Sequence, residues 1–262
     1  MPELPDVEVF RRYVDATSLH QGITAVDLDA ARMLEGARAE EILAVLTGGR
    51  FEATTRRGKF LFVRLADGPW LVLHFGMTGF LTYYKADGAA PAHTRLLVQF
   101  DTGYRLAGVW RRRLGRIDLA QAPDIFAIDH DLGPDALAAG LNRDELAALL
   151  ADRRGGLKSA LMDQSLLAGI GNVYADEILF HAGLAPHRRA AALEDDELDA
   201  LHSSLRRVPA EAIDAGAEPG RLPSSWLLPH REAGAHCPAC GGELVRDRVA
   251  GRTTWWCPHC QR

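Results

Sequence analysis

Residues 237–260 read CPACGGELVRDRVAGRTTWWCPHC, and this stretch fixes the architecture of the C-terminal end of the chain. It contains two C-x2-C pairs separated by sixteen residues: Cys237, Cys240, Cys257 and Cys260. This spacing lets four thiolates meet around one tetrahedral zinc ion at the base of a β-hairpin. Four thiolates leave no open coordination position, so we expect one structural zinc ion rather than a catalytic one.

The residues between the two cysteine pairs are expected to form the hairpin, over 243–252, with its turn near Ala250-Gly251. Arg252 follows this turn and could reach outward to a partner, or could simply be a solvated surface arginine. The alternative use of the four cysteines is two short-range disulfides. Because disulfides are rare in cytosolic proteins, the zinc interpretation is favoured.

The region before this hairpin is predicted to be helical. Apolar residues at helical spacing indicate helices over 143–151, 157–164, 173–182 and 194–215, and Pro209 is expected to kink or restart the last of them. The sequence LAGIGN at residues 167–172 lies between two of these helices. Its glycines permit a close backbone approach, and the free amides at the next helix N-terminus favour an anion, helped by Asn172 and the nearby Lys158. A simple interhelical turn is the alternative.

The first half of the chain is predicted to be a helix followed by antiparallel strands. The helix is expected over residues 7–19. Between residues 50 and 119, short runs rich in β-branched and aromatic residues predict strands over 60–65, 70–75, 80–84, 95–100 and 104–110. Turn sequences at 66–69 and 101–103 separate these runs. The predicted fold class is therefore α+β. We expect an N-terminal helix and antiparallel β-sandwich over 1–131, a helical domain over 132–230 and a zinc hairpin over 231–262.

The charge of the chain is unevenly distributed. Its 262 residues are 47% hydrophobic and 25% charged, as in ordinary soluble proteins, and the formal net charge of −5 by itself argues against a polyanionic partner. Locally, however, basic residues exceed acidic ones at 50–64, at 101–120 and in the zinc hairpin segment. Such clusters are either solvated faces or parts of a groove that binds a nucleic-acid backbone. No apolar run approaches 18 residues, and the N-terminus lacks a signal-peptide pattern, so we expect a cytosolic protein without a membrane segment.

The N-terminus, Met-Pro-Glu-Leu-Pro-Asp, can supply a nucleophile. Removal of Met1 would leave Pro2 as a secondary amine, which can attack an aldehyde carbon and form an iminium ion. Glu3 and Asp6 are close enough in sequence to serve as general acid or base. Taken alone, this start is also commonplace in proteins without such chemistry.

The motifs resemble, in order and over essentially the whole chain, the formamidopyrimidine-DNA glycosylase and endonuclease VIII family. They are PELP at 2–5, RRGK at 56–59, HFGMTG at 74–79, GIGN at 169–172 and, inside the cysteine hairpin, GRTT at 251–254. The resemblance implies a helix-two-turns-helix motif in the helical domain. It also implies a monomer that acts on damaged double-stranded DNA in the bacterial cytosol.

The resemblance also implies a role for each matched residue. Pro2 would attack C1′ of the damaged nucleotide, and strand cleavage would follow by β- and δ-elimination. Glu3 would protonate the sugar, and Lys59 would support base release and hold a phosphate. The remaining matches are implied DNA contacts: Asn172, Arg252, Lys158 and Gly171, together with Met77, Arg112 and Leu114, which would fill the space left by a flipped nucleotide.

Two departures from the family pattern leave the substrate open. Asp6 replaces a glutamate, which shortens that side chain by one methylene, and residues 218–226 do not reproduce the loop that covers 8-oxoguanine. Excision of 8-oxoguanine and formamidopyrimidine lesions is the favoured expectation. The alternatives are an endonuclease VIII-like preference for oxidised pyrimidines, or lesion binding with little catalysis. A metal-dependent nuclease is disfavoured, because thiolates saturate the predicted metal site.

Overall fold

The computed structural model describes residues 1–66 and 68–262, so that Asp67, part of a predicted turn, lies outside the described residues. The chain divides into two compact units. The first holds residues 1–2 and 6–130, and the second holds residues 3–5 and 131–262. A division into three domains stays a prediction.

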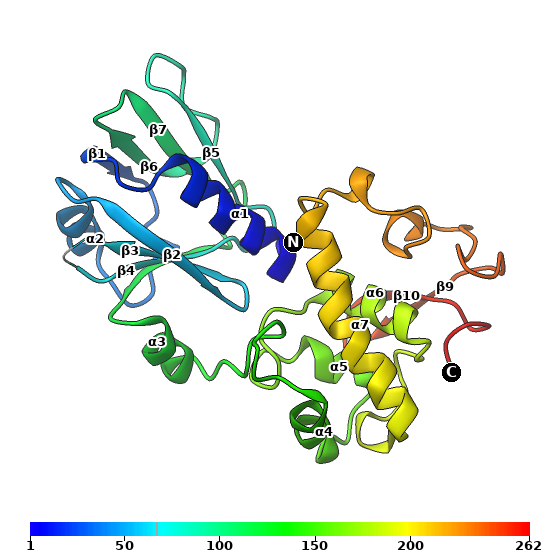
Figure 1. Ribbon diagram of the computed structural model, residues 1–262. Coiled ribbons are helices and arrows are strands. Elements are labelled where there is room, and N and C mark those ends of the chain that lie inside the picture. Colours follow the sequence, from blue (N-terminus) through cyan, green and yellow to red (C-terminus); the bar gives the residue numbers. More distant parts are fainter. Residues whose placement is uncertain (67) are drawn as a thin grey trace. The chain divides into compact units, whose positions relative to one another are not determined.

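The first unit contains a long helix and two four-stranded antiparallel sheets (Figure 1). One sheet has the order β1-β6-β7-β5 and the other has the order β2-β3-β4-β8. The elements are α1 (Leu4–Thr17), β1 (Ile23–Leu28), α2 (Ala39–Leu46), β2 (Phe51–Arg57), β3 (Phe60–Leu65), β4 (Trp70–His74), β5 (Phe80–Lys85), β6 (Thr94–Phe100), β7 (Tyr104–Val109), β8 (Arg116–Ala120) and α3 (Pro123–Asp129).

The two sheets share one hydrophobic core. Alternate residues of β3 and β4, such as Leu61 and Leu73, pack in the same cluster as Val98 and Leu106 of the other sheet. This arrangement confirms the predicted sandwich. The hairpins expected from the turn sequences are also present, because β3 pairs with β4 and β6 pairs with β7.

Five elements of this unit have no bounds predicted from the sequence: β1, α2, β2, β8 and α3. The strand β1 is an edge strand that pairs only with β6 and buries only Ile23, so its apolar alternation is weak. The helices α2 and α3 have eight and seven residues, which is too short for a clear helical period.

The second unit is a helical domain that continues into a β-hairpin. Its α-helices are α4 (Arg143–Ala151), α5 (Leu157–Met162), α6 (Asn172–Ala182) and α7 (Asp195–Asp214). A short 3-10 turn, η1 (Ala190–Ala192), lies between α6 and α7, and two more, η2 (Pro219–Arg221) and η3 (Leu228–His230), follow α7. The hairpin strands are β9 (Val245–Val249) and β10 (Arg252–Trp256).

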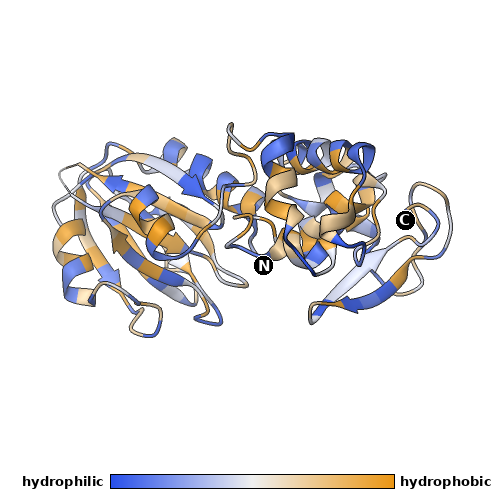
Figure 2. Cartoon of the chain, turned by 90° about the horizontal axis from the view of Figure 1, so that it is seen from below, coloured by the Kyte–Doolittle hydropathy of each residue, from blue (hydrophilic) through white to orange (hydrophobic). Residues whose placement is uncertain are grey.

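Local sequence explains where the helices of this unit begin and end. Asn142 accepts a hydrogen bond from the Glu145 amide before α4, and Gly183 adopts a left-handed conformation (φ +70°) after α6. The helix does not restart at Pro209, since α7 continues through it. In Figure 2, the helices and strands of both units carry hydrophobic and hydrophilic residues in turn. No helix in the described ranges is long and apolar enough to cross a membrane.

Candidate active site and metal centre

The carboxylate of Glu3 binds the N-terminus of α6. It accepts hydrogen bonds from the backbone N–H groups of Gly171 (2.9 Å), Val173 (2.9 Å) and Tyr174 (3.1 Å), and Glu3 is only 1% exposed. The first amides of a helix lack intrahelical partners and carry partial positive charge, so a carboxylate is favoured there. The anion predicted for this helix N-terminus is therefore supplied by the chain itself. The Gly171 amide is already engaged and does not offer a free N–H to DNA.

Two glycines make room for this N-terminal segment. A Cβ atom on Gly171 would lie 2.4 Å from Cδ of Glu3, and one on Gly169 would lie 2.6 Å from Cδ1 of Leu4. Gly169 also has a φ of +113°, and its carbonyl accepts the Leu4 amide at 3.0 Å. The glycines of LAGIGN are thus explained by close packing of Glu3 and Leu4.

Because Glu3 is anchored, the position of the preceding residue, Pro2, is restricted. Pro2 is half-buried and directly precedes the anchored Glu3, while Met1 is 48% exposed. Asp6 lies three residues after Glu3, in the first turn of α1. The nucleophile candidate and the two acid candidates are therefore joined by one short segment.

Lys59 lies in the tight turn between β2 and β3, next to Gly58, whose φ is +55°. Its side chain is largely buried, and its charge acts on His74 at the end of β4. Burial, reinforced by the charges of Lys59 and Arg116, lowers the pKa of His74 from 6.5 to about 4. His74 is therefore neutral at pH 7, and its Nδ1 accepts the Gly76 amide at 3.3 Å. The sequence pattern alone predicts no role for His74.

Two loops of the first unit carry the three proposed space-filling residues. Met77 and Leu114 are 41% and 52% exposed, which is unusual for large apolar side chains, and Arg112 is exposed beside them. An Arg112 Nη1 atom lies 3.3 Å from Met77 Sδ. The loops contact each other closely, because a Cβ on Gly76 would lie 2.4 Å from the Leu114 carbonyl oxygen. Met77, Arg112 and Leu114 therefore project from two loops that pack against each other.

The hairpin brings the strand that begins at Arg252 into contact with Asn172. Ala250 and Gly251 both have positive φ angles (+48° and +75°), so the chain turns in two residues, as expected. Arg252 is exposed just after this turn. Asn172, at the first position of α6, donates from Nδ2 to the Thr253 carbonyl at 3.0 Å. An amide nitrogen has two hydrogens, so Asn172 retains one for another acceptor.

Lys158 differs from the other cations. It is 0% exposed, and its Nζ lies 2.7 Å from Asp176 Oδ1 and 2.7 Å from Thr254 Oγ1. Burial lowers the pKa of Lys158 and raises that of Asp176. The expected direct contact between Lys158 and DNA is corrected here, because its ammonium group is enclosed by protein.

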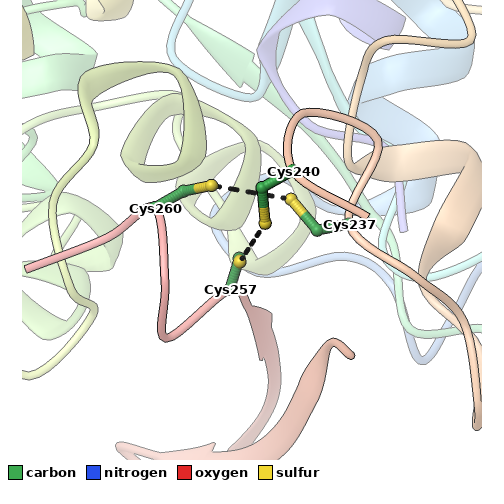
Figure 3. A group of neighbouring side chains, drawn as sticks. All are labelled: Cys237, Cys240, Cys257 and Cys260. Atoms are coloured by element: carbon green, nitrogen blue, oxygen red, sulfur yellow. Dashed lines mark hydrogen bonds between the residues drawn. The ribbon is translucent and has the colours of Figure 1, made fainter. Parts of the chain in front are cut away.

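The four cysteines converge at the base of the hairpin (Figure 3). All four Sγ atoms lie within 4.8 Å of one another, with Cys237 and Cys260 at 3.8 Å and Cys240 and Cys257 at 3.5 Å. Tetrahedral zinc with Zn–S bonds of 2.3 Å needs sulfur atoms about 3.8 Å apart. A disulfide would need about 2.05 Å. The donor set fits zinc, which supplies structural crosslinking, and the disulfide alternative does not match this geometry.

The segment at 218–226 packs onto the helical core at its end. Trp226 is 1% exposed, and Glu177 of α6 accepts the amides of Leu227 (2.9 Å) and Leu228 (2.6 Å). Leu222 is 8% exposed. This segment is therefore anchored through apolar side chains and a buried carboxylate.

Comparison with protein families gives three matches along the chain. Residues 1–117 match the formamidopyrimidine-DNA glycosylase N-terminal domain, and residues 132–222 match the H2TH domain of the same family. Residues 236–262 match a zinc finger found in FPG and IleRS. Together these models account for most of the sequence.

Individual relatives cover the full chain. The formamidopyrimidine-DNA glycosylases of Desulfitobacterium hafniense and Roseiflexus sp. are each 34% identical, with 100% of this chain and of the relative covered. Among solved structures, a complex of Lactococcus lactis Fpg with DNA containing N7-benzyl-Fapy-dG has a TM-score of 0.90 at 27% identity. A complex of MutM with DNA containing carbocyclic 8-oxo-G has a TM-score of 0.90 at 28% identity. Both cover 100% of each chain.

Proposed function

The chain belongs to the formamidopyrimidine-DNA glycosylase family, and we propose that it is a bifunctional DNA glycosylase and AP lyase of base excision repair. Its substrate would be an oxidised base in duplex DNA. The observation that carries the catalytic proposal is the anchoring of Glu3 on α6, because this bond network fixes the adjacent Pro2.

The proposed reaction begins at the amine of Pro2, freed by removal of Met1. The nitrogen lone pair attacks C1′, the C1′–base bond breaks, and the base leaves with the proton that the Pro2 nitrogen loses. The sugar ring then opens and the amine nitrogen becomes part of an iminium ion. Loss of the C2′ proton expels the 3′ phosphate, and a second elimination expels the 5′ phosphate. No oxidant or reductant is consumed.

Glu3 and Asp6 are the proposed proton-transfer groups. Glu3 is held beside Pro2 by three amides, so its carboxyl group is pre-positioned at the sugar that Pro2 attacks. After taking up a proton, Glu3 would donate it to the ring oxygen as the ring opens. Asp6 occupies the first turn of α1 and would serve as a second acid or base with a shorter reach than glutamate.

The first unit would flip the nucleotide and support base release. Met77, Arg112 and Leu114 project from two loops that brace each other, which suits them to occupy the space vacated in the base stack. Lys59 would contact a phosphate and assist departure of the base. Its position in a tight two-residue turn supports a fixed cation there.

The second unit would bind the DNA backbone through Asn172 and Arg252. The hydrogen bond from Asn172 to the Thr253 carbonyl holds Asn172 against the strand that begins at Arg252, although the two are far apart in sequence. One amide donor and one guanidinium form a suitable pair for neighbouring phosphates.

The lesion class is proposed as 8-oxoguanine and formamidopyrimidine, in preference to oxidised pyrimidines. The arrangement of the space-filling residues on two loops supports purine lesions, and the printed names of the relatives point the same way. The different segment at 218–226 is the feature that favours the pyrimidine alternative. Turnover of duplexes with 8-oxoguanine, formamidopyrimidine, thymine glycol and dihydrouracil distinguishes the two.

Borohydride trapping tests the proposed chemistry. Reduction of the iminium ion should join the protein covalently to a duplex with an abasic site. A matched preparation that retains Met1, verified by intact mass, should give no adduct because the nitrogen of Pro2 is then an amide. If a verified free Pro2 gives no adduct either, the chain is a lesion-binding protein without this chemistry, the second candidate suggested by Asp6.

We also propose that the protein acts as a monomer in the bacterial cytoplasm. The bacterial origin of the curated relatives supports this location. Sedimentation of the protein with and without duplex DNA would test its stoichiometry.

A further inference from the structure

The outer edge of β10 is held by side chains of the helical domain. One edge of this strand pairs with β9. On the other edge, the Thr253 carbonyl accepts from Asn172 Nδ2 at 3.0 Å and from Lys158 Nζ at 3.4 Å. The Trp255 amide donates to Asp176 Oδ2 at 3.2 Å. Helices α5 and α6 thus provide the partners that a third strand would give.

Asp176 is the centre of a buried charge cluster. Its Oδ1 atom lies 2.7 Å from Lys158 Nζ, and its Oδ2 atom lies 2.7 Å from Arg231 Nη2. The side chains of Asp176 and Lys158 are 0% exposed, and that of Arg231 is 15% exposed. The cluster joins α5, α6 and the segment that leads into the zinc hairpin.

Thr254 connects this cluster to Arg252. Its hydroxyl oxygen accepts from Lys158 Nζ at 2.7 Å and donates to the Arg252 carbonyl at 3.2 Å. A short chain of contacts therefore runs from Asp176 through Lys158 and Thr254 to the backbone of Arg252. The only exposed side chain in this series is that of Arg252 itself.

Stability alone is a weak reason for such a cluster. Removing charges from water is costly, and buried ion pairs are often no more stabilising than apolar residues of similar volume. Burial raises the pKa of Asp176 and lowers that of Lys158, in line with this cost. What apolar residues could not supply is directional bonding to the strand edge at Thr253 and Trp255.

We propose that Asp176, with Lys158 and Arg231, is a positioning residue that fixes the zinc hairpin so that Arg252 and Asn172 can bind DNA phosphates together. This inference rests on the DNA-binding part of the proposed function. Zinc closes the base of the hairpin, whereas the Asp176 cluster sets the position of its strand along α6. Lys158 thus serves DNA binding without touching DNA.

The charge of Asp176 makes a sharp test possible. By electrostatics alone, removing a carboxylate from a DNA-binding unit should raise affinity for DNA or leave it unchanged. The positioning role predicts the opposite for Asp176→Asn. Each carboxylate oxygen faces a cation, so either orientation of the asparagine places its NH₂ group against Lys158 or Arg231.

The matched control is Asp247→Asn, which removes an exposed carboxylate from β9 of the same hairpin. We expect Asp176→Asn to weaken binding to a duplex with a tetrahydrofuran abasic analogue by about tenfold or more, as for a lost hydrogen bond to a charged group. The slope of log Kd against log salt should fall by about one unit as the Arg252 phosphate contact is lost. Asp247→Asn should bind at least as tightly as the wild type with an unchanged slope.

A second pair of variants covers the case in which Asp176→Asn fails to fold. Thr254→Val removes the hydroxyl that links Lys158 to Arg252, while Thr254→Ser keeps it. We expect Thr254→Val to reduce affinity and salt slope and Thr254→Ser to restore both. Zinc content and thermal midpoint, measured for each variant, identify a chain that has not folded.

The outcomes separate this inference from the proposed catalysis. If folded, zinc-loaded Asp176→Asn and Thr254→Val bind the duplex as tightly as Asp247→Asn and with the wild-type slope, the positioning role is wrong. If the variants change DNA binding as expected but the wild type, although it binds DNA, yields no borohydride adduct, the proposed catalysis fails and the positioning role stands.

Discussion

The Gly171 Cα and the Glu3 carboxyl group are so close that a Cβ on Gly171 would lie 2.4 Å from Glu3 Cδ. The carboxylate also accepts the Gly171 amide at 2.9 Å. The Glu3 carboxylate therefore fits at the N-terminus of α6 only because the glycine at position 171 has no side chain. This packing makes the catalytic proposal depend on a residue 168 positions away from Glu3.

Gly171→Ala should displace Glu3 and reduce base excision. The added methyl group meets the carboxyl carbon, so Glu3 must move away from the α6 amides. We expect a loss of about 100-fold in single-turnover excision, since a misplacement of about 1 Å has this effect. Gly155→Ala is the control, because a Cβ there meets nothing within 4 Å. Equal excision rates for the two variants would show that the packing of Gly171 against Glu3 does not control excision.

Glu3→Gln should separate base release from strand cleavage. Three backbone N–H groups point at the carboxylate, and the glutamine NH₂ must face at least one of them. With the proton donor also lost, excision should slow by about 100-fold or more. Cleavage of a preformed abasic site, where Pro2 meets an aldehyde, should fall much less. The two rates are compared by gel assay, and parallel losses would count against a role in base release.

Arg252→Ala and Lys59→Ala should each weaken binding to all duplexes. Each removes one phosphate contact, so the slope of log Kd against log salt should decrease by about one unit. Arg38→Ala is the matched control, since Arg38 is exposed and ion-paired with Glu41 on α2. A slope identical to that of Arg38→Ala would place the tested residue outside the DNA interface.

Acid should destabilise the first unit through His74. Its folded pKa of about 4 lies below the ordinary 6.5, so the unfolded chain binds the extra proton between these values. The stability present above pH 6.5 is lost as the pH falls towards 4, by about 2 kcal/mol between pH 7 and pH 5. Denaturant unfolding at both pH values measures this loss. In His74→Gln, the free energy of unfolding should fall by about 2 kcal/mol less between pH 7 and pH 5 than in the wild type. An equal fall in both proteins would exclude His74 as the source of the pH dependence.

Much of the fold followed from local patterns. The cysteine spacing indicated the metal site, and the Ala250-Gly251 turn follows from residues that tolerate or favour positive φ. The strands β3 to β7 and the helices α4 to α7 were predicted within a few residues, because each buries a face with a clear period. Edge strand β1 and short helix α2 carry too few buried residues for such a period.

The site was less predictable, because its contacts join distant residues. The sequence indicated an anion site at the start of α6, but not that Glu3 occupies it. It placed Lys158 among cations available to DNA, whereas folding encloses it against Asp176. A sequence pattern reports the chemistry of a side chain and its local backbone, while burial and partners depend on the packing of α5, α6 and β10.

The sequence by itself established which chemical groups the protein has: a proline after the initiator methionine, a turn lysine, four thiols at zinc spacing and two neighbouring glycines. Folding assigned their neighbours. Glu3 reaches α6 because two glycines leave space, and β10 lies against Asn172 because side chains of α5 and α6 bind one edge of the strand. Desolvation and close packing act between residues far apart in the chain, which is why local sequence could not specify them.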